Sequence, residues 1–141
     1  MATTRNATTH WEGSLMEGSG RVTLESSGLG TFDVNWPSRA ESADGRTSPE
    51  ELIAAAHSSC FSMALSHALA QAGTPPTSLD TSAAVTFQPG EGITGIVISV
   101  VGLVPGVDDA AFVAAAEGAK ANCPVSKALA GTAITLDARL G

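Results

Sequence analysis

Short runs that alternate apolar and polar residues fill the first 36 positions of the chain. Glycines and serines separate these runs at intervals typical of β-hairpins. Three of the runs have the composition of strands: THWEGS, GRVTLES and TFDVNW. We therefore predict a three-stranded antiparallel meander, followed by a polar loop rich in turn residues, PSRAESADGRTSPEE.

The pattern changes at Ser48-Pro49-Glu50-Glu51, which offers a cap residue, a proline for the first helical position and acids for the first turn. We predict a helix from Pro49 to Ala72, ended by Gly73 and the Pro75-Pro76 pair. No charged residue occurs between Leu52 and Leu65. A helix that is uncharged on all sides is usually central and covered on several faces.

The second half of the chain repeats a strand-rich pattern and then becomes helical. DTSAAVTFQPG and GITGIVISVVGLVPG favour two paired strands, and DDAAFVAAAEGAKAN favours a helix that Cys123-Pro124 interrupts. A short turn, VSKAL, and a last strand, TAITLDARL, complete the chain. The order β-β-β-α-β-β-α-β indicates an α+β fold with mainly antiparallel sheets, and 141 residues suit a single domain, residues 1–141.

Composition and charge exclude several classes of function. The net charge is −7, and the seven basic residues are scattered, which argues against binding to nucleic acid or to an anionic membrane surface. No run of 18 apolar residues occurs, and the first 20 residues lack the basic-then-apolar order of a signal peptide. We expect a cytoplasmic protein.

The two cysteines are the main candidates for chemistry. Cys123 follows Cys60 by 63 residues, which matches neither a zinc motif nor a closely spaced redox pair. In a reducing cytosol both are expected to be thiols, and any bond between them is expected to be transient and catalytic. A purely structural role remains open for both, because free cysteine is commonly buried and Cys123 also suits a helix end.

Local surroundings rank the two thiols differently from each other. Cys60 lies in the middle of the predicted helix on a mostly apolar face, where a thiol is normally inert. Its ionisation would require a cation, and Arg21, Arg39 and Arg46 are the only basic residues between Asn6 and Lys120. Cys123 precedes Pro124 in an N-cap-like position, which makes it the more acidic thiol on local sequence alone.

Metal and phosphate chemistry find little support in the chain. His57 and His67 lie ten residues apart on one predicted helix, and no second cluster of ligands completes a metal site. They are better explained as core or interface histidines. The glycines of GEGITG form a turn between strands and do not open a helix, so they are not a nucleotide-binding motif. We expect no cofactor and no metal.

Three segments together resemble the OsmC/Ohr family of thiol-dependent peroxidases, most closely its OsmC branch: TSPEELIAAAHSSCFSMALSHAL, NCPVSKAL and ITLDARL. The resemblance extends from His10 to the final strand. It implies an intertwined homodimer of α+β subunits, with two active sites at the subunit interface and a long central helix that carries the reactive cysteine.

The resemblance also implies roles for particular residues. Cys60 matches the peroxidatic cysteine, which becomes a sulfenic acid as an organic hydroperoxide is reduced to an alcohol, and Cys123 matches the resolving cysteine, which forms a disulfide with it. An external dithiol, often a lipoylated protein in this family, would restore both thiols. Glu50 matches the family's glutamate, acting through an arginine or from the other subunit. Arg39 best fits the activating arginine, with Arg21 as its substitute.

Two assignments remain open beside these. Arg46, in the turn DGRT, is expected to be a surface residue. A ligand-binding or stress-related structural protein without redox turnover is the alternative function, because a fold by itself does not establish an activity.

Overall fold

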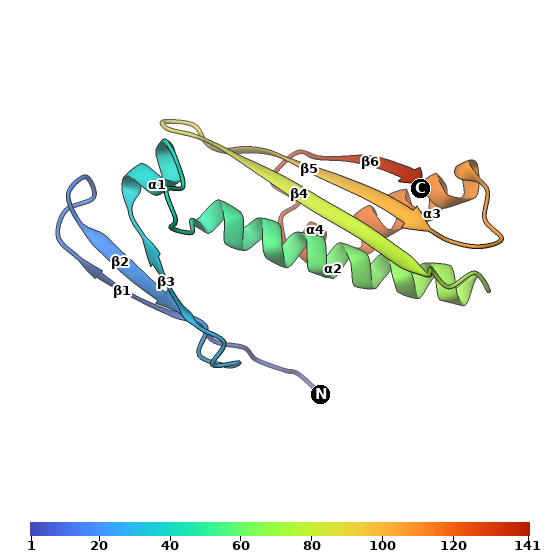
Figure 1. Cartoon of the computed structure of the whole chain (residues 1–141), viewed down its shortest axis with the longest axis horizontal. Coiled ribbons are helices and arrows are strands. Elements are labelled where there is room, and N and C mark those ends of the chain that lie inside the picture. The colour runs from blue at the N-terminus through green and yellow to red at the C-terminus, as the bar shows by residue number, and fades with distance from the viewer. The chain divides into compact units, whose positions relative to one another are not determined.

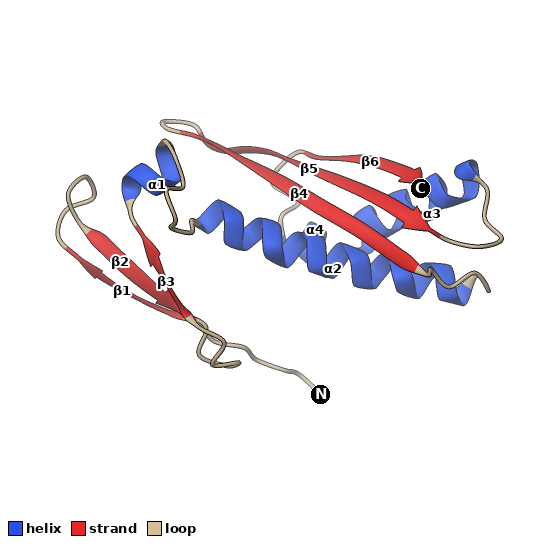
Figure 2. Cartoon of the chain, viewed as in Figure 1, coloured by secondary structure: helices blue, strands red, loops and turns tan.

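The computed structural model describes residues 1–141, which form six strands and four helices (Figures 1 and 2). The chain divides into two compact units, Met1–Leu52 and Ile53–Gly141, with the division falling inside the longest helix. The units are therefore described separately. The predicted α+β class is confirmed, because both units contain sheets and the helices are few and separate from the strands in sequence.

The first unit contains the predicted meander. Strands β1 (Thr8–Glu12), β2 (Ser19–Thr23) and β3 (Thr31–Val34) pair antiparallel in the order β1-β2-β3. Gly20 lies opposite Trp11 on β1, and a Cβ on Gly20 would lie 2.7 Å from the indole ring. Glycine is required there because the Trp11 side chain crosses directly over the β2 backbone.

A short helix, α1 (Trp36–Ala40), takes in the last residue of the third predicted strand run, Trp36, and the first four residues of the predicted loop. Asn35 caps it: the Asn35 Oδ1 accepts a hydrogen bond of 2.8 Å from the Ser38 N–H, and the Asn35 N–H donates to the Ser38 hydroxyl. The strand prediction for Trp36 and the loop prediction for residues 37–40 were wrong because a single turn of helix has no hydrophobic period to detect. Its importance is that it carries Arg39.

Helix α2 (Pro49–Gln71) begins where predicted and ends one residue earlier. Gly73 adopts a φ of 85°, and the Thr74 N–H donates to the Leu69 carbonyl, which terminates the helix. The side chains buried along α2 recur every fourth residue: His57, Phe61, Leu65 and Leu69. The opposite side of α2 is exposed and still uncharged: Ala55, Ala56, Ser59, Met63 and His67. A single chain therefore covers this helix on one side only, whereas we expected several covered faces.

The second sheet is mixed and not purely antiparallel. Strands β4 (Ser78–Gln88) and β5 (Gly92–Leu103) pair antiparallel, but β6 (Ile134–Leu140) pairs parallel to β5. Helices α3 (Asp109–Asn122) and α4 (Pro124–Ala128) form the connection between β5 and β6. A parallel pair needs such a crossover, which these two helices provide. The other three strand pairings are antiparallel, in agreement with the predicted mainly antiparallel sheets.

The core of the second unit lies between this sheet and helices α2 and α3 (Figure 1). It contains Phe61 from α2, Phe112 from α3 and alternate residues of β5 that face the helices, such as Ile98. The intervening Val97 is 46% exposed, so the other face of the sheet is open within the chain. By length and mean hydropathy α2 is the one helix long and apolar enough to span a membrane, and one row of its side chains packs in this core.

The start of α3 depends on one cap, which yields a testable prediction. The Asp108 carboxylate accepts a hydrogen bond of 2.8 Å from the Ala111 N–H. Asp108→Ala should lower the free energy of unfolding by about 1 kcal/mol, measured by urea denaturation. Asp109→Ala is the matched control, because Asp109 is exposed in the first turn and its loss should have a smaller effect. Equal effects would contradict the cap.

Candidate active site

The structure brings Cys60 and Cys123 together within the second unit. Cys60 lies midway along α2 and is half-buried, whereas Cys123 is fully buried in the core. Both are free thiols, and each interacts with the other's side chain. Cys123 sits at the junction of α3 and α4, where Pro124 prevents α3 from continuing, so the break in the helix positions the second sulfur.

The surroundings of Cys123 change the pKa of its thiol in two opposing ways. Burial raises the pKa of the Cys123 thiol, but hydrogen bonding from the Cys60 thiol, from the Ser126 N–H and hydroxyl and from the Val125 N–H outweighs burial and lowers that pKa. These groups approach the sulfur without forming a regular cap, since Cys123 makes no standard side-chain cap hydrogen bond to α4. The direction agrees with the expectation from its N-cap-like position.

Cys60 is affected in the opposite sense. Burial raises the pKa of the Cys60 thiol, and the interaction with Cys123 raises it further, against a smaller lowering by the Val125 N–H. No lysine or arginine of the second unit contributes to this shift. The more accessible sulfur therefore needs a positive group from elsewhere before it ionises, as we inferred from the sequence.

His57 lies beside this pair as a buried histidine. Its Nε2 is 2.7 Å from the hydroxyl oxygen of Ser126, and burial lowers the pKa of its imidazole. His57 is thus a core histidine, as expected, whereas His67 is exposed on the same helix. No group of three or more histidine, cysteine or acidic side chains is arranged to hold a metal ion.

Arg39 and Glu50, both singled out from the sequence, form an ion pair within the first unit. The Arg39 Nη2 lies 2.9 Å from Glu50 Oε1, and its Nε lies 3.0 Å from the same oxygen and 3.3 Å from Oε2. The Glu50 side chain is only 8% exposed and that of Arg39 is 31% exposed. A carboxylate held in the first turn of α2 thus fixes the orientation of the guanidinium.

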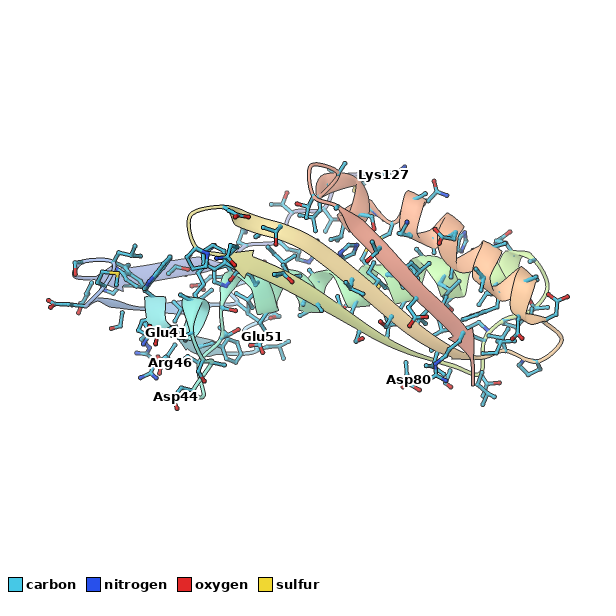
Figure 3. The ribbon with its side chains drawn as sticks, turned by 90° about the horizontal axis from the view of Figure 1, so that it is seen from above. Glu41, Asp44, Arg46, Glu51, Asp80 and Lys127 are labelled. Atoms are coloured by element: carbon cyan, nitrogen blue, oxygen red, sulfur yellow. The ribbon has the colours of Figure 1, made fainter.

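The other two arginines are placed differently. Arg21 is 70% exposed and lies 3.7 Å from Asp33 on the neighbouring strand. Arg46 lies 3.9 Å from Asp44 in the loop between α1 and α2, where Figure 3 labels both, so it is the surface residue we expected. Arg39 alone of the three is held by a buried carboxylate.

Arg39 also borders an apolar cavity of about 280 Å³ within the first unit. Two tryptophans and several aliphatic side chains form most of the lining: Trp11, Trp36, Leu15, Val22, Val34 and Leu52. A cavity with one fixed cation at its border suits a molecule that is largely apolar with a single polar group.

Sequence reasoning did not single out Ser126. It follows Cys123 by three residues, the N3 position relative to the cap of α4, where backbone and side chain point back toward the cap residue. That spacing was the available signal. The contact with His57 was not detectable, because 69 residues separate the two in the chain.

Comparisons with known proteins identify the family of this chain. The model of the OsmC family, described as OsmC-like protein, matches residues 42–138. Peroxiredoxin OsmC of Escherichia coli K12 and its counterpart in Shigella flexneri are each 46% identical over 134 residues, covering 93% of this chain and 92% of the relative.

Solved structures show the same fold. An organic hydroperoxide resistance protein OsmC from Legionella pneumophila matches with a TM-score of 0.78 at 24% identity, covering 99% of this chain and 98% of that one. An organic hydroperoxide resistance protein from Elizabethkingia anophelis matches with a TM-score of 0.72 at 23% identity over the full length of both chains. The resemblance seen in the sequence is confirmed, and the chain belongs to the family of OsmC-like proteins.

Proposed function

We propose that this protein is a cysteine-dependent peroxidase that reduces organic hydroperoxides to alcohols and so protects the cell against oxidative stress. The observation that carries the proposal is the pair of neighbouring free thiols, one accessible and one buried, in a chain 46% identical to Peroxiredoxin OsmC of Escherichia coli. Relatives named for organic hydroperoxide resistance share the fold.

In the proposed first step the Cys60 thiolate attacks one oxygen of the peroxide bond. The O–O bond breaks, the alkoxide leaves and takes up a proton to become the alcohol, and Cys60 becomes a sulfenic acid. Access favours Cys60 for this role, because Cys123 is fully buried and a peroxide cannot reach its sulfur.

In the second step the Cys123 thiolate attacks the Cys60 sulfur. The new S–S bond replaces the S–O bond, and the departing hydroxide takes up a proton to become water. A dithiol then reduces the disulfide by exchange, and a lipoylated protein is a suitable source. The lowered pKa of Cys123 supports its role as the attacking group in this step.

Arg39 is the proposed activator of Cys60, with Glu50 holding its guanidinium in place. The cation would offset the burial that raises the pKa of the Cys60 thiol. The apolar cavity beside Arg39 suits the organic part of a hydroperoxide better than it suits hydrogen peroxide. No cofactor has a part in this scheme, since the sulfurs carry the electrons themselves.

The active form is proposed to be an intertwined homodimer in the cytoplasm, where thiols are kept reduced. The uncharged, exposed side of α2, including Ala56 and Met63, supports a second copy of the chain as its cover.

The proposal is tested by mass spectrometry after one equivalent of cumene hydroperoxide. We expect a loss of about two mass units per chain and a peptide that joins Cys60 to Cys123, because each turnover removes two thiol hydrogens. The Cys123→Ser protein is the matched control and should instead trap the sulfenic acid on Cys60. Two unreacted thiols in the wild-type protein would support a ligand-binding protein and contradict the peroxidase.

A further inference from the structure

His57 presents a feature that the proposed reaction does not use. It is fully buried in the second unit, and its Nδ1 is the one buried side-chain nitrogen or oxygen without a hydrogen-bond partner. Its Nε2 lies 2.7 Å from the Ser126 hydroxyl oxygen. A buried polar atom that lacks a partner costs stability, so its presence in a well-packed core calls for a reason.

The reason lies in what Ser126 contacts. Ser126 is 5% exposed and lies in the first turn of α4, three residues after Cys123, the cap residue of that helix. Hydrogen bonding from Ser126 is one of the causes that lower the pKa of the Cys123 thiol. Cys123 in turn interacts with Cys60. One continuous row of polar groups therefore runs from His57 through Ser126 to Cys123 and reaches the accessible sulfur.

The hydrogen atoms in this row can be assigned by elimination. A serine hydroxyl has one proton to donate. If His57 carried its proton on Nδ1, that buried N–H would have no acceptor, and Ser126 would donate to Nε2 and keep no proton for the sulfur. Orphaned buried N–H groups are rare, whereas a bare nitrogen lone pair is more readily tolerated. The tautomer with the proton on Nε2 is therefore favoured, and the Ser126 proton is left for Cys123.

We propose that His57 and Ser126 are positioning residues for the resolving step: the neutral His57 donates from Nε2 to the Ser126 oxygen, which aims the Ser126 hydroxyl proton at the Cys123 sulfur. The inference rests on the proposed function, in which Cys123 attacks the sulfenic acid of Cys60. No proton passes to His57. Its part is to hold one hydroxyl in one orientation.

The effect on the chemistry is specific to one step. A thiolate that already accepts a hydrogen bond from Ser126 is present in larger amount when the sulfenic acid forms, so the S–S bond forms sooner. Cys60 is the one titratable group that contributes to the shift of Cys123 in a single chain, and the other contributions that lower its pKa are hydrogen bonds from Ser126 and Val125. Rapid resolution also shortens the time in which a second peroxide can oxidise Cys60 further.

Thiolate titration provides the first test. In a Cys60→Ser background, the ultraviolet absorbance of the thiolate reports Cys123 alone. Ser126→Ala should move this titration upward by about one pH unit, and His57→Leu should move it in the same direction. His57→Gln should leave the Cys123 titration close to its position in the Cys60→Ser protein, because the glutamine side chain provides an N–H donor without a titrating group. If His57 acted as a base, His57→Gln would raise the Cys123 titration as much as His57→Leu does.

Rapid kinetics with the two cysteines present provide the second test. Ser126→Ala should leave oxidation of Cys60 by cumene hydroperoxide within about twofold of wild type but slow disulfide formation about tenfold, since one unit of pKa is a tenfold change. Sulfinic acid on Cys60 should accumulate in excess peroxide. Ser66→Ala, which alters a serine of α2 elsewhere in the second unit, is the matched control and should change neither step.

The outcomes separate this inference from the proposed function. An unchanged Cys123 titration in the folded Ser126→Ala protein would overturn the inference, as would equal slowing of both steps. If His57→Leu does not fold, the titrations of Ser126→Ala and His57→Gln still show whether these two residues stabilise the Cys123 thiolate. A wild-type protein that forms no disulfide would instead overturn the proposed function, whereas the titration in the Cys60→Ser background would still report whether Ser126 stabilises the Cys123 thiolate.

Discussion

The Cys60→Ser protein should consume no organic hydroperoxide above the rate of the reductant alone, a loss of at least about 10³-fold in kcat/KM. A serine hydroxyl at this position has no accessible oxidation state and is not ionised near neutral pH. Cys123 cannot substitute, because its sulfur is fully buried. The measurement is steady-state consumption of cumene hydroperoxide with a lipoyl dithiol, with thermal unfolding to show that the variant is folded.

Cys123→Ser is the informative partner of that experiment. It keeps the attacking sulfur and removes the resolving one, so it should consume about one equivalent of peroxide per chain and then stop, because the disulfide that the dithiol reduces does not form. Sustained turnover by the Cys60→Ser protein would show that the reaction does not pass through Cys60, and the proposed mechanism would have to be abandoned.

Arg39→Ala should slow oxidation of Cys60 about 100-fold at neutral pH, because a nearby opposite charge shifts a pKa by one to three units. The sign follows from the charge: without the guanidinium the pKa of the Cys60 thiol rises, so the thiolate and the rate should recover as the pH is raised. The measurement is the rate of Cys60 oxidation as a function of pH. Arg39→Lys should be intermediate, since it keeps the charge and loses the fork that pairs with Glu50.

The matched control is Arg21→Ala, which removes the exposed alternative arginine and should change the rate less than about twofold. Arg39→Ala also leaves Glu50 buried and unpaired, which lowers stability. The double variant Arg39→Ala/Glu50→Gln removes that unpaired charge, so it should recover stability without recovering rate. A large loss with Arg21→Ala and none with Arg39→Ala would transfer the activating role to Arg21.

The sequence predicted the elements that have strong local signals. Ser48-Pro49 and Gly73 marked the two ends of α2 to within one residue, because capping and chain reversal are determined by neighbouring residues. Helix α1 was missed, since its cap is a single Asn35–Ser38 exchange and its five residues have no period. The parallel direction of β6 was also missed, because a strand's own residues do not specify which neighbour it joins.

The site likewise contains residues that the sequence identified from local signals and contacts that only the structure reveals. Cys60, Cys123, Arg39 and Glu50 came from their own residue types and from the motifs around them. The structure added the contacts between distant positions: the ion pair between α1 and α2, and the approach of Ser126 to both His57 and Cys123. Such contacts depend on how helices pack across the core, and a single sequence contains no direct record of that packing.

Cys60 and Cys123 are 63 residues apart in the chain, and the segment between them includes β4, β5 and α3. A bond between them would therefore close a large ring and restrict the unfolded chain, which corresponds to about 4 kcal/mol from loop-closure entropy. The oxidised form of such an enzyme would resist denaturation better than its resting form. Each catalytic cycle would then pass through a form with a higher free energy of unfolding, at the time when oxidants are most abundant.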